Sequence, residues 1–129
     1  MKKRIMIFLG IFIGFVSIIA LTMYIKINQN ADKILDNEIE EVDLKEVEDG
    51  LYEGEYYSEG IGLIVHVEVK NHEIISIEYE NHQYGQGYKA EAIKESIIHS
   101  QSVLVDDVSG ATISSRCIKL AIIDALKEA

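Results

Sequence analysis

The segment from Asp106 to Ser115 holds the side chains best placed to do chemistry. It precedes a stretch of helical periodicity, so it lies at the predicted start of a helix. Unpaired backbone N–H groups and the positive end of the helix dipole favour a phosphate there. Gly110 and Ala111 keep side-chain bulk away from the turn. The hydroxyls come from Ser109, Thr112, Ser114 and Ser115. The residues alone therefore predict a phosphate-sized site, in which the Thr112 hydroxyl is open to modification.

An ordinary helix cap is the alternative interpretation of the same segment. Serine and threonine are the expected residues at a helix start whether or not a ligand binds. Their presence therefore does not by itself distinguish a binding site from a cap, and both interpretations stay open on the residues alone.

Other residue types that do chemistry show weaker patterns. The four histidines lack metal-ligand spacing, and the single cysteine, Cys117, excludes an internal disulfide and a multi-cysteine metal site. No serine, histidine and aspartate order and no pair of catalytic carboxylates indicates a hydrolase. Gly60 and Gly62 precede a predicted strand and not a helix, which argues against a nicotinamide-binding fingerprint. We predict no catalytic residue and no metal site.

An apolar run near the N-terminus predicts a membrane anchor. Residues 5–25 are 21 residues without a charge, and a helix of that length crosses a hydrocarbon core of about 30 Å. Lys2, Lys3 and Arg4 precede the run and acidic sequence follows it, so the positive-inside rule predicts a cytoplasmic N-terminus and an extracytoplasmic C-terminal part. A cleaved signal peptide fits less well, because the run is long and no A-x-A-like site follows it. We predict a single-pass protein of the cell membrane, with residues 1–27 as the basic start and the anchor in membrane lipid.

Charge separates the two ends of the chain. Residues 1–30 carry four basic side chains and no acid, whereas residues 31–129 carry 22 acids and eight bases. Such an acidic body repels phosphate backbones, so we expect no nucleic-acid partner. Residues 28–48 form an acidic linker, which we interpret as a solvated spacer.

Residues 49–129 predict an α+β domain, a small antiparallel sheet with two packed helices. Strands are expected over 51–57, 63–70 and 74–79, helices over 88–101 and 113–126, and a short strand over 103–105. Gly54 indicates a bulge in the first strand. The face expected to be buried consists of Leu63, Val65, Val67, Val69, Ile75, Ile77 and Tyr79. In the last helix we expect Arg116, Lys119, Asp124 and Lys127 on the polar side.

The sequence resembles the FMN-binding domain family, which includes the covalent-flavin subunits of the sodium-pumping NADH:quinone reductase and of the Rnf electron-transport complex. The family pattern is D-x-x-[ST]-G-A-T-x-[ST]-S. It is matched at every specified position by Asp106, Ser109, Gly110, Ala111, Thr112, Ser114 and Ser115. A D-G-x-Y-x-G start at residues 49–54, the strand after Gly62 and a loop histidine, His82, extend the resemblance to about residues 49–126.

The resemblance implies a phosphoester between the Thr112 hydroxyl and FMN, installed by an ApbE-type flavin transferase with FAD as donor. It also implies that the transferase reads Asp106, Ser109, Gly110 and Ala111. The large-complex subunits carry an E-T-P-G-like loop where this chain has residues 81–85 and no proline, which is typical of a short, stand-alone member. We predict that His82 and Tyr84 line the flavin ring, although both can equally be ordinary loop residues.

The implied function is that of a membrane-anchored extracytoplasmic flavoprotein. It would transfer electrons between membrane redox proteins or quinone-linked donors and an external acceptor, as an electron carrier and not as a stand-alone enzyme. The alternatives are a non-covalent FMN-binding sensor or assembly subunit of a membrane complex, and a plain structural anchor. Loss of flavin on denaturation would favour non-covalent binding.

Overall fold

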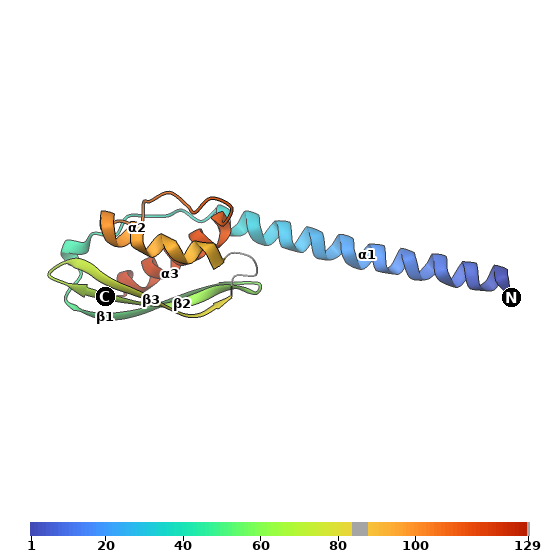
Figure 1. The fold of residues 1–129 in the computed structure, drawn as a ribbon, viewed down its shortest axis with the longest axis horizontal. Helices are drawn as coiled ribbons and strands as arrows, with labels where there is room; N and C mark the ends of the chain where they lie inside the picture. The colour runs from blue at the N-terminus through green and yellow to red at the C-terminus, as the bar shows by residue number, and fades with distance from the viewer. Residues whose placement is uncertain (84–87, 129) are drawn as a thin grey trace. The chain divides into compact units, whose positions relative to one another are not determined.

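The computed structural model describes residues 1–83 and 88–128. The chain divides into two compact units, Met1–Lys33 and Ile34–Ala129 (Figure 1). The first unit consists of helix alone, and the second holds the sheet and the remaining helices.

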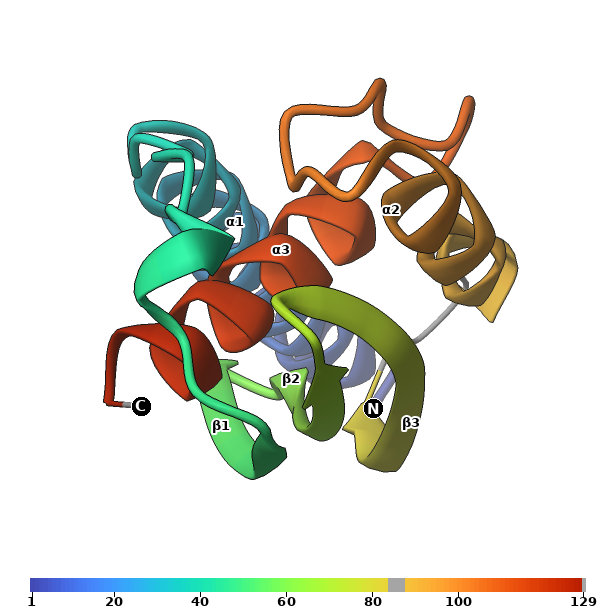
Figure 2. The same cartoon turned by 90° about the vertical axis from the view of Figure 1, so that its left-hand side faces the viewer.

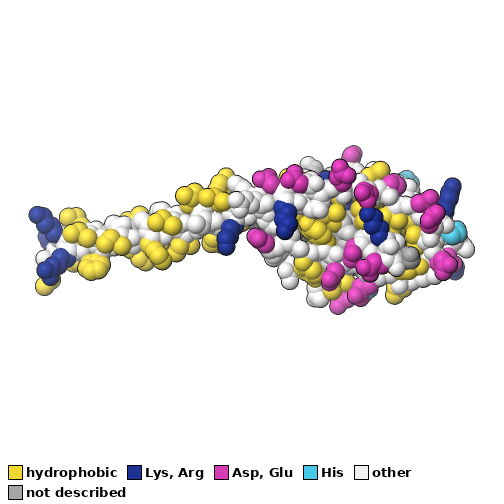
Figure 3. Space-filling model, turned by 180° about the vertical axis from the view of Figure 1, so that it is seen from behind, with side chains coloured by type: hydrophobic (Ala, Val, Ile, Leu, Met, Phe, Trp, Pro, Cys, Tyr) yellow, Lys and Arg dark blue, Asp and Glu magenta, His cyan; other side chains and the backbone are white. Residues whose placement is uncertain are grey.

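Helix α1 spans Lys2–Leu35, so its last two residues belong to the second unit. The segment contains no proline to interrupt the helix, and its large apolar side chains between Ile5 and Ile27 are exposed (Figure 3). By length and composition it is the one helix in the described part of the chain that could cross a membrane. This agrees with the predicted single-pass anchor.

The second unit is built on a three-stranded antiparallel sheet in the order β1-β2-β3. The strands are β1 (Gly50–Ser58), β2 (Ile61–Lys70) and β3 (Glu73–Gln83). Asn71 and His72 join β2 to β3 with positive φ at both positions, as a tight hairpin turn requires. The predicted meander is therefore confirmed.

The helices pack on one face of this sheet. They are a short 3₁₀ helix, η2 (Tyr88–Ala92), followed by α2 (Ile93–Ser100) and α3 (Thr112–Lys127). Figure 2 shows α3 over the sheet and α2 beside it. The core between the layers contains the alternating residues of β2, all of them at most 1% exposed, and Ala90, Ile93 and Ile97 at helical spacing. The predicted α+β class is therefore confirmed.

The buried residue of β3 near the hairpin is Ile74 and not Ile75. Val69 pairs with Ile74 while Glu68 pairs with Ser76, so Ile75 is the extra residue of a β-bulge. Ile74 is 2% exposed and Ile75 is 45% exposed. The prediction for Ile75 was wrong because a bulge shifts the inward and outward alternation by one position.

Gly54 marks a close approach and not a bulge. The pairing of β1 with β2 is continuous from Gly50 to Ser58. A Cβ at Gly54 would lie 2.2 Å from the carbonyl oxygen of Ala121 and 2.3 Å from the amide nitrogen of Ala125. The glycine therefore lets the backbone of α3 rest directly on β1.

Residues 103–105 form no strand, contrary to the sequence expectation. The Leu104 N–H bonds the Ser102 hydroxyl at 3.0 Å and the Val105 carbonyl accepts a bond from the Lys119 ammonium. These backbone groups therefore bond side chains, whereas in a strand they would bond a neighbouring strand. Val103 is buried, while Leu104 is 58% exposed.

The acidic segment differs in part from a solvated spacer. Its residues from Ile34 onward belong to the second unit and include a short 3₁₀ helix, η1 (Leu44–Glu46). Ile34 is fully buried and Val47 is 3% exposed, with both in the core. These apolar side chains, spaced among the acids, hold the segment against the domain.

Candidate functional site

Thr112 is the first residue of α3, and its side chain is exposed. The residue before it, Ala111, has φ −137° and ψ 39° and caps the helix without a side-chain hydrogen bond. The predicted alternative, a serine or threonine cap, is therefore not how this helix begins. Because the first N–H groups of any α-helix lack intrahelical acceptors, this end of α3 can receive an anion.

A four-residue turn leads into the helix. The Ala111 N–H donates to the Val108 carbonyl at 2.9 Å, and Gly110 has φ +79°. A left-handed third residue is the type II pattern, which favours glycine. A Cβ at Gly110 would meet nothing within 4 Å, so backbone conformation and not lack of space explains the glycine. This corrects the expectation that Gly110 is there to keep bulk away.

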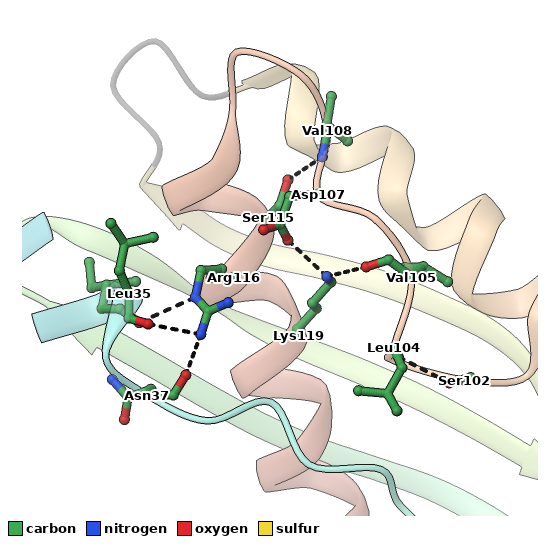
Figure 4. A network of polar contacts seen from close by, with 11 residues as sticks. Leu35, Asn37, Ser102, Leu104, Val105, Asp107, Val108, Ser115, Arg116 and Lys119 are labelled. Carbon is green, nitrogen blue, oxygen red and sulfur yellow. Dashed lines mark hydrogen bonds and ion pairs between the residues drawn. The ribbon is translucent and has the colours of Figure 1, made fainter. Parts of the chain in front are cut away.

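Two side chains of α3 hold the segment that precedes this turn (Figure 4). The Ser115 hydroxyl accepts a hydrogen bond from the Val108 N–H at 3.0 Å. The Lys119 ammonium lies 2.8 Å from the Asp107 carboxylate and also donates to the Val105 carbonyl. Together these bonds fasten residues 105–108 onto the helix that carries Thr112.

The predicted site residues separate into an exposed group and a buried group. The exposed residues are Asp106, Ser109, Gly110 and Thr112, and the buried ones are Ala111, Ser114 and Ser115. The Ser115 hydroxyl accepts the bond from the Val108 N–H, so it contacts the turn and not another molecule. The exposed group is the part that another molecule can reach.

Lys119 and Asp107 were missed as partners by the sequence reasoning. Lys119 was expected on the polar side of the last helix, but it is only 4% exposed. The available signal was its position between Ile118 and Leu120, in a helix that is apolar at most positions. The motif specifies Asp106 and leaves position 107 open, so it gives no signal for Asp107.

His82 lies at the end of β3, where a second register shift separates the pairs of Gly62 and Ile64. Its side chain is 5% exposed, and Nδ1 lies 2.9 Å from the Glu91 carboxylate on η2. Its ring centre is 5.9 Å from that of Tyr79. Tyr84, the second residue predicted beside the flavin ring, lies outside the described residues.

Tyr79 supports this corner of the domain. Its hydroxyl donates to the Glu91 carbonyl at 2.8 Å, and the Lys94 ammonium lies 5.3 Å from the centre of its ring. Burial raises the pKa of the Tyr79 hydroxyl. The phenol therefore remains a protonated donor at neutral pH, and it joins β3 to η2.

The start of α3 and His82 lie at the same end of the sheet. Toward its C-terminus, α3 packs on Gly54 in the middle of β1. Toward its N-terminus, Arg116 donates to the Asn37 carbonyl, and the amide of Asn37 donates to the hydroxyl of Tyr56, nearer the end of β1. Continuing in that direction brings the start of α3 to the end where β3 also finishes (Figure 1). Fold and motif therefore gather the exposed hydroxyl and the buried histidine at one end.

Acidic side chains spread over the face of the second unit that is visible in Figure 3. A cavity of about 630 Å³ lies elsewhere, lined by residues 41–45, His72, Glu73 and Gln101. Among the described residues, no group of three His, Cys, Asp or Glu is placed to hold a metal ion.

The family model of the FMN-binding domain matches residues 57–127. The match covers more than half of the chain and includes β2, β3, all of α2 and α3, and the segment 106–115. No curated protein and no solved structure matches the chain.

Proposed function

The chain belongs to the FMN-binding domain family, and on that premise we propose that Thr112 carries FMN as a phosphoester. We further propose that the protein works as a membrane-anchored, extracytoplasmic electron carrier. The observation that supports attachment is the exposed Thr112 hydroxyl at a helix start that no side chain caps, within the matched region. Bound FMN supplies one-electron and two-electron transfer, while the protein sets its position and access.

The residues present suit a phosphate ester. The first-turn N–H groups of α3 can donate to phosphate oxygens, and the open turn at Gly110 leaves room beside the hydroxyl. Attachment by a flavin transferase would join Thr112 Oγ to the FMN phosphorus as the pyrophosphate bond of FAD breaks. AMP is the leaving group, and the hydroxyl proton is released. Asp106 and Ser109, both exposed beside Thr112, are the side chains we assign to transferase recognition.

The predicted membrane topology favours partners at the membrane. Only eight residues, 26–33, separate the uncharged run from the compact unit that begins at Ile34. These eight residues belong to α1, and as a helix they are about 12 Å long. We therefore assign the electron donor to membrane redox proteins or quinone-linked donors, and the acceptor to the outer side of the membrane.

The attachment test uses the full-length protein co-expressed with a flavin transferase. We expect the wild type to gain the mass of FMN less one water and to fluoresce in a denaturing gel. Thr112→Ala should lose both signals, and Thr112→Ser should retain at least part of them. Ser100→Ala, which removes an exposed hydroxyl on α2, is the control and should match the wild type.

Two results would contradict covalent attachment at Thr112. One is a fluorescent, mass-shifted Thr112→Ala protein. The other is a wild type whose flavin leaves on denaturation, which would favour the non-covalent sensor or assembly subunit. Topology is tested separately by adding protease to intact cells, where an extracytoplasmic domain is cleaved and a cytoplasmic one is protected.

A further inference from the structure

Lys119 is a buried charge whose partners both lie in the segment before the turn. Its side chain is 5% exposed, and its ammonium pairs with Asp107 at 2.8 Å and bonds the Val105 carbonyl. Asp107 is itself 22% exposed. Replacing a buried ion pair with apolar side chains is often neutral or stabilising, so such a pair is weak evidence for a role in stability. The contacts of Lys119 instead hold the Val105 carbonyl and the Asp107 side chain in place.

The loop that contains residues 105–107 has no regular structure, so side-chain contacts help to hold its conformation. Residues 101–111 contain neither helix nor strand. Its ends are held by backbone bonds, from Ser102 N–H to the Ile97 carbonyl and from Ala111 N–H to the Val108 carbonyl. Its middle is held by Lys119 and Ser115 on α3 (Figure 4).

The holding residues share a helix face with the proposed acceptor. Thr112, Ser115 and Lys119 follow one another at intervals of three and four residues in α3, and such intervals place side chains on the same face. The turn that they hold contributes the exposed Ser109 and Gly110 immediately before Thr112. Movement of residues 105–107 would therefore be passed directly to the surroundings of the Thr112 hydroxyl.

We propose that Lys119 is a positioning residue that fixes the turn beside Thr112 and thereby restrains the flavin attached there. This inference rests on the proposed attachment of FMN to Thr112. Lys119 acts through Asp107 and the Val105 carbonyl. Without it, the flavin remains attached but moves more freely on the nanosecond timescale.

The test measures the time-resolved fluorescence anisotropy of the flavin in the flavinylated full-length protein. In Lys119→Met, an apolar side chain of similar length removes the ammonium, and Asp107 can turn to water. We expect the amplitude of the fast depolarisation to rise about twofold, because local motions of a released loop occur within nanoseconds. The thermal unfolding midpoint is recorded for each variant, so that a change in flavin motion is not confused with unfolding.

Lys127→Met is the matched control. It removes another lysine of α3 that is paired with a carboxylate, Glu40, at 2.5 Å, but that pair is exposed and away from the turn. Its anisotropy decay should equal that of the wild type. If Lys119→Met fails to fold, Asp107→Asn tests the same pair from the loop side and should also increase the fast component.

The outcomes distinguish attachment of the flavin at Thr112 from its restraint by Lys119. A wild type that gains no flavin mass overturns the proposed attachment, whatever the variants do. A flavinylated Lys119→Met protein with an unchanged decay overturns the role of Lys119, while the attachment stands. An equal increase in Lys127→Met would also overturn that role, since the effect would then follow the loss of any ion pair on the helix.

Discussion

Gly110 and Gly54 are both glycines for physical reasons, but the reasons differ. Gly110 adopts φ +79° and has open space where a side chain would point. Gly54 has backbone atoms of α3 within 2.2 Å and 2.3 Å of where a Cβ would stand. At Gly110 the backbone conformation favours glycine, whereas at Gly54 there is no space for a side chain.

Alanine substitutions should separate these two effects. Gly110→Ala should lower the free energy of unfolding by about 1 kcal/mol, the cost of a left-handed residue with a Cβ. Gly54→Ala should cost about 3 kcal/mol, because helix and strand must move apart. Urea titrations of the two variants measure the difference. Equal losses would show that the contact between β1 and α3 is looser than the structure indicates.

Burial of Cys117 makes the stability of the domain decrease at alkaline pH. It is fully buried, and burial raises the pKa of its thiol to about 11. In the unfolded chain the thiol ionises near pH 8.5, so between these values the unfolded state binds fewer protons than the native state. Stability is therefore fully present below the unfolded pKa and is lost as the pH rises toward the folded one.

The loss attributable to Cys117 should be about 3 kcal/mol between about pH 8 and about pH 11. It is measured as the difference in unfolding free energy between the wild type and Cys117→Ala across that range. Other alkaline groups, such as Tyr79 with its raised pKa, are common to both proteins and cancel. Parallel pH profiles would contradict the assignment.

At the scale of elements, Arg116 joins α3 to the segment at the start of the second unit. Its guanidinium donates to the carbonyls of Ile34 at 3.5 Å, Leu35 at 3.1 Å and Asn37 (Figure 4). The carbonyls of Ile34 and Leu35 are among the last of α1 and lack intrahelical partners. A cation at a helix C-terminus is also favoured by the helix dipole. Arg116, a residue of α3, thus bonds the last carbonyls of α1.

Arg116→Gln should lower the free energy of unfolding by about 2 kcal/mol, as expected for hydrogen bonds from a charged donor. Arg116→Lys should recover only part of this loss, because an ammonium keeps the charge but lacks the planar fork that reaches several carbonyls. Thermal unfolding of both variants checks the order. A lysine variant as weak as the glutamine variant would show that the charge is unimportant.

At the scale of the whole molecule, the folded unit begins earlier than the acidic composition suggests. Ile34 and Val47 are buried in the core, and Ile39, Val42 and Leu44 pack against it. The acids between them face solvent, because charged side chains are rarely buried without partners. The same segment is therefore acidic outside and apolar inside.

Two truncations test this boundary. Residues 34–129 should fold as a soluble unit. Residues 49–129 lack Ile34 and Val47 and should be less stable by at least about 4 kcal/mol from the loss of these two buried side chains, and they also lose the bonds of Arg116. Circular dichroism during thermal unfolding compares them. Equal unfolding midpoints would restore the interpretation of residues 34–48 as a detached spacer.

Much of this architecture is predictable from the sequence because it depends on local periodicity. The alternation from Leu63 to Val69 determines which face of β2 is buried, since successive strand residues point to opposite sides. The spacing of Ala90, Ile93 and Ile97 determines which side of η2 and α2 is buried against the sheet. The uncharged run in α1 likewise indicates a possible membrane span from length and composition.

Only the tertiary structure decided the features that depend on partners distant in the chain. Ile74 replaces Ile75 in the core because of how β3 pairs with β2 at a bulge. Lys119 is buried because Asp107 and the Val105 carbonyl meet its charge. The exposed Thr112 hydroxyl was predictable as a motif position, but the bonds that hold its turn were not. Local periodicity specifies a residue's face within its own element, whereas burial of a charge or a shift of register depends on contacts that form only when separate elements pack together.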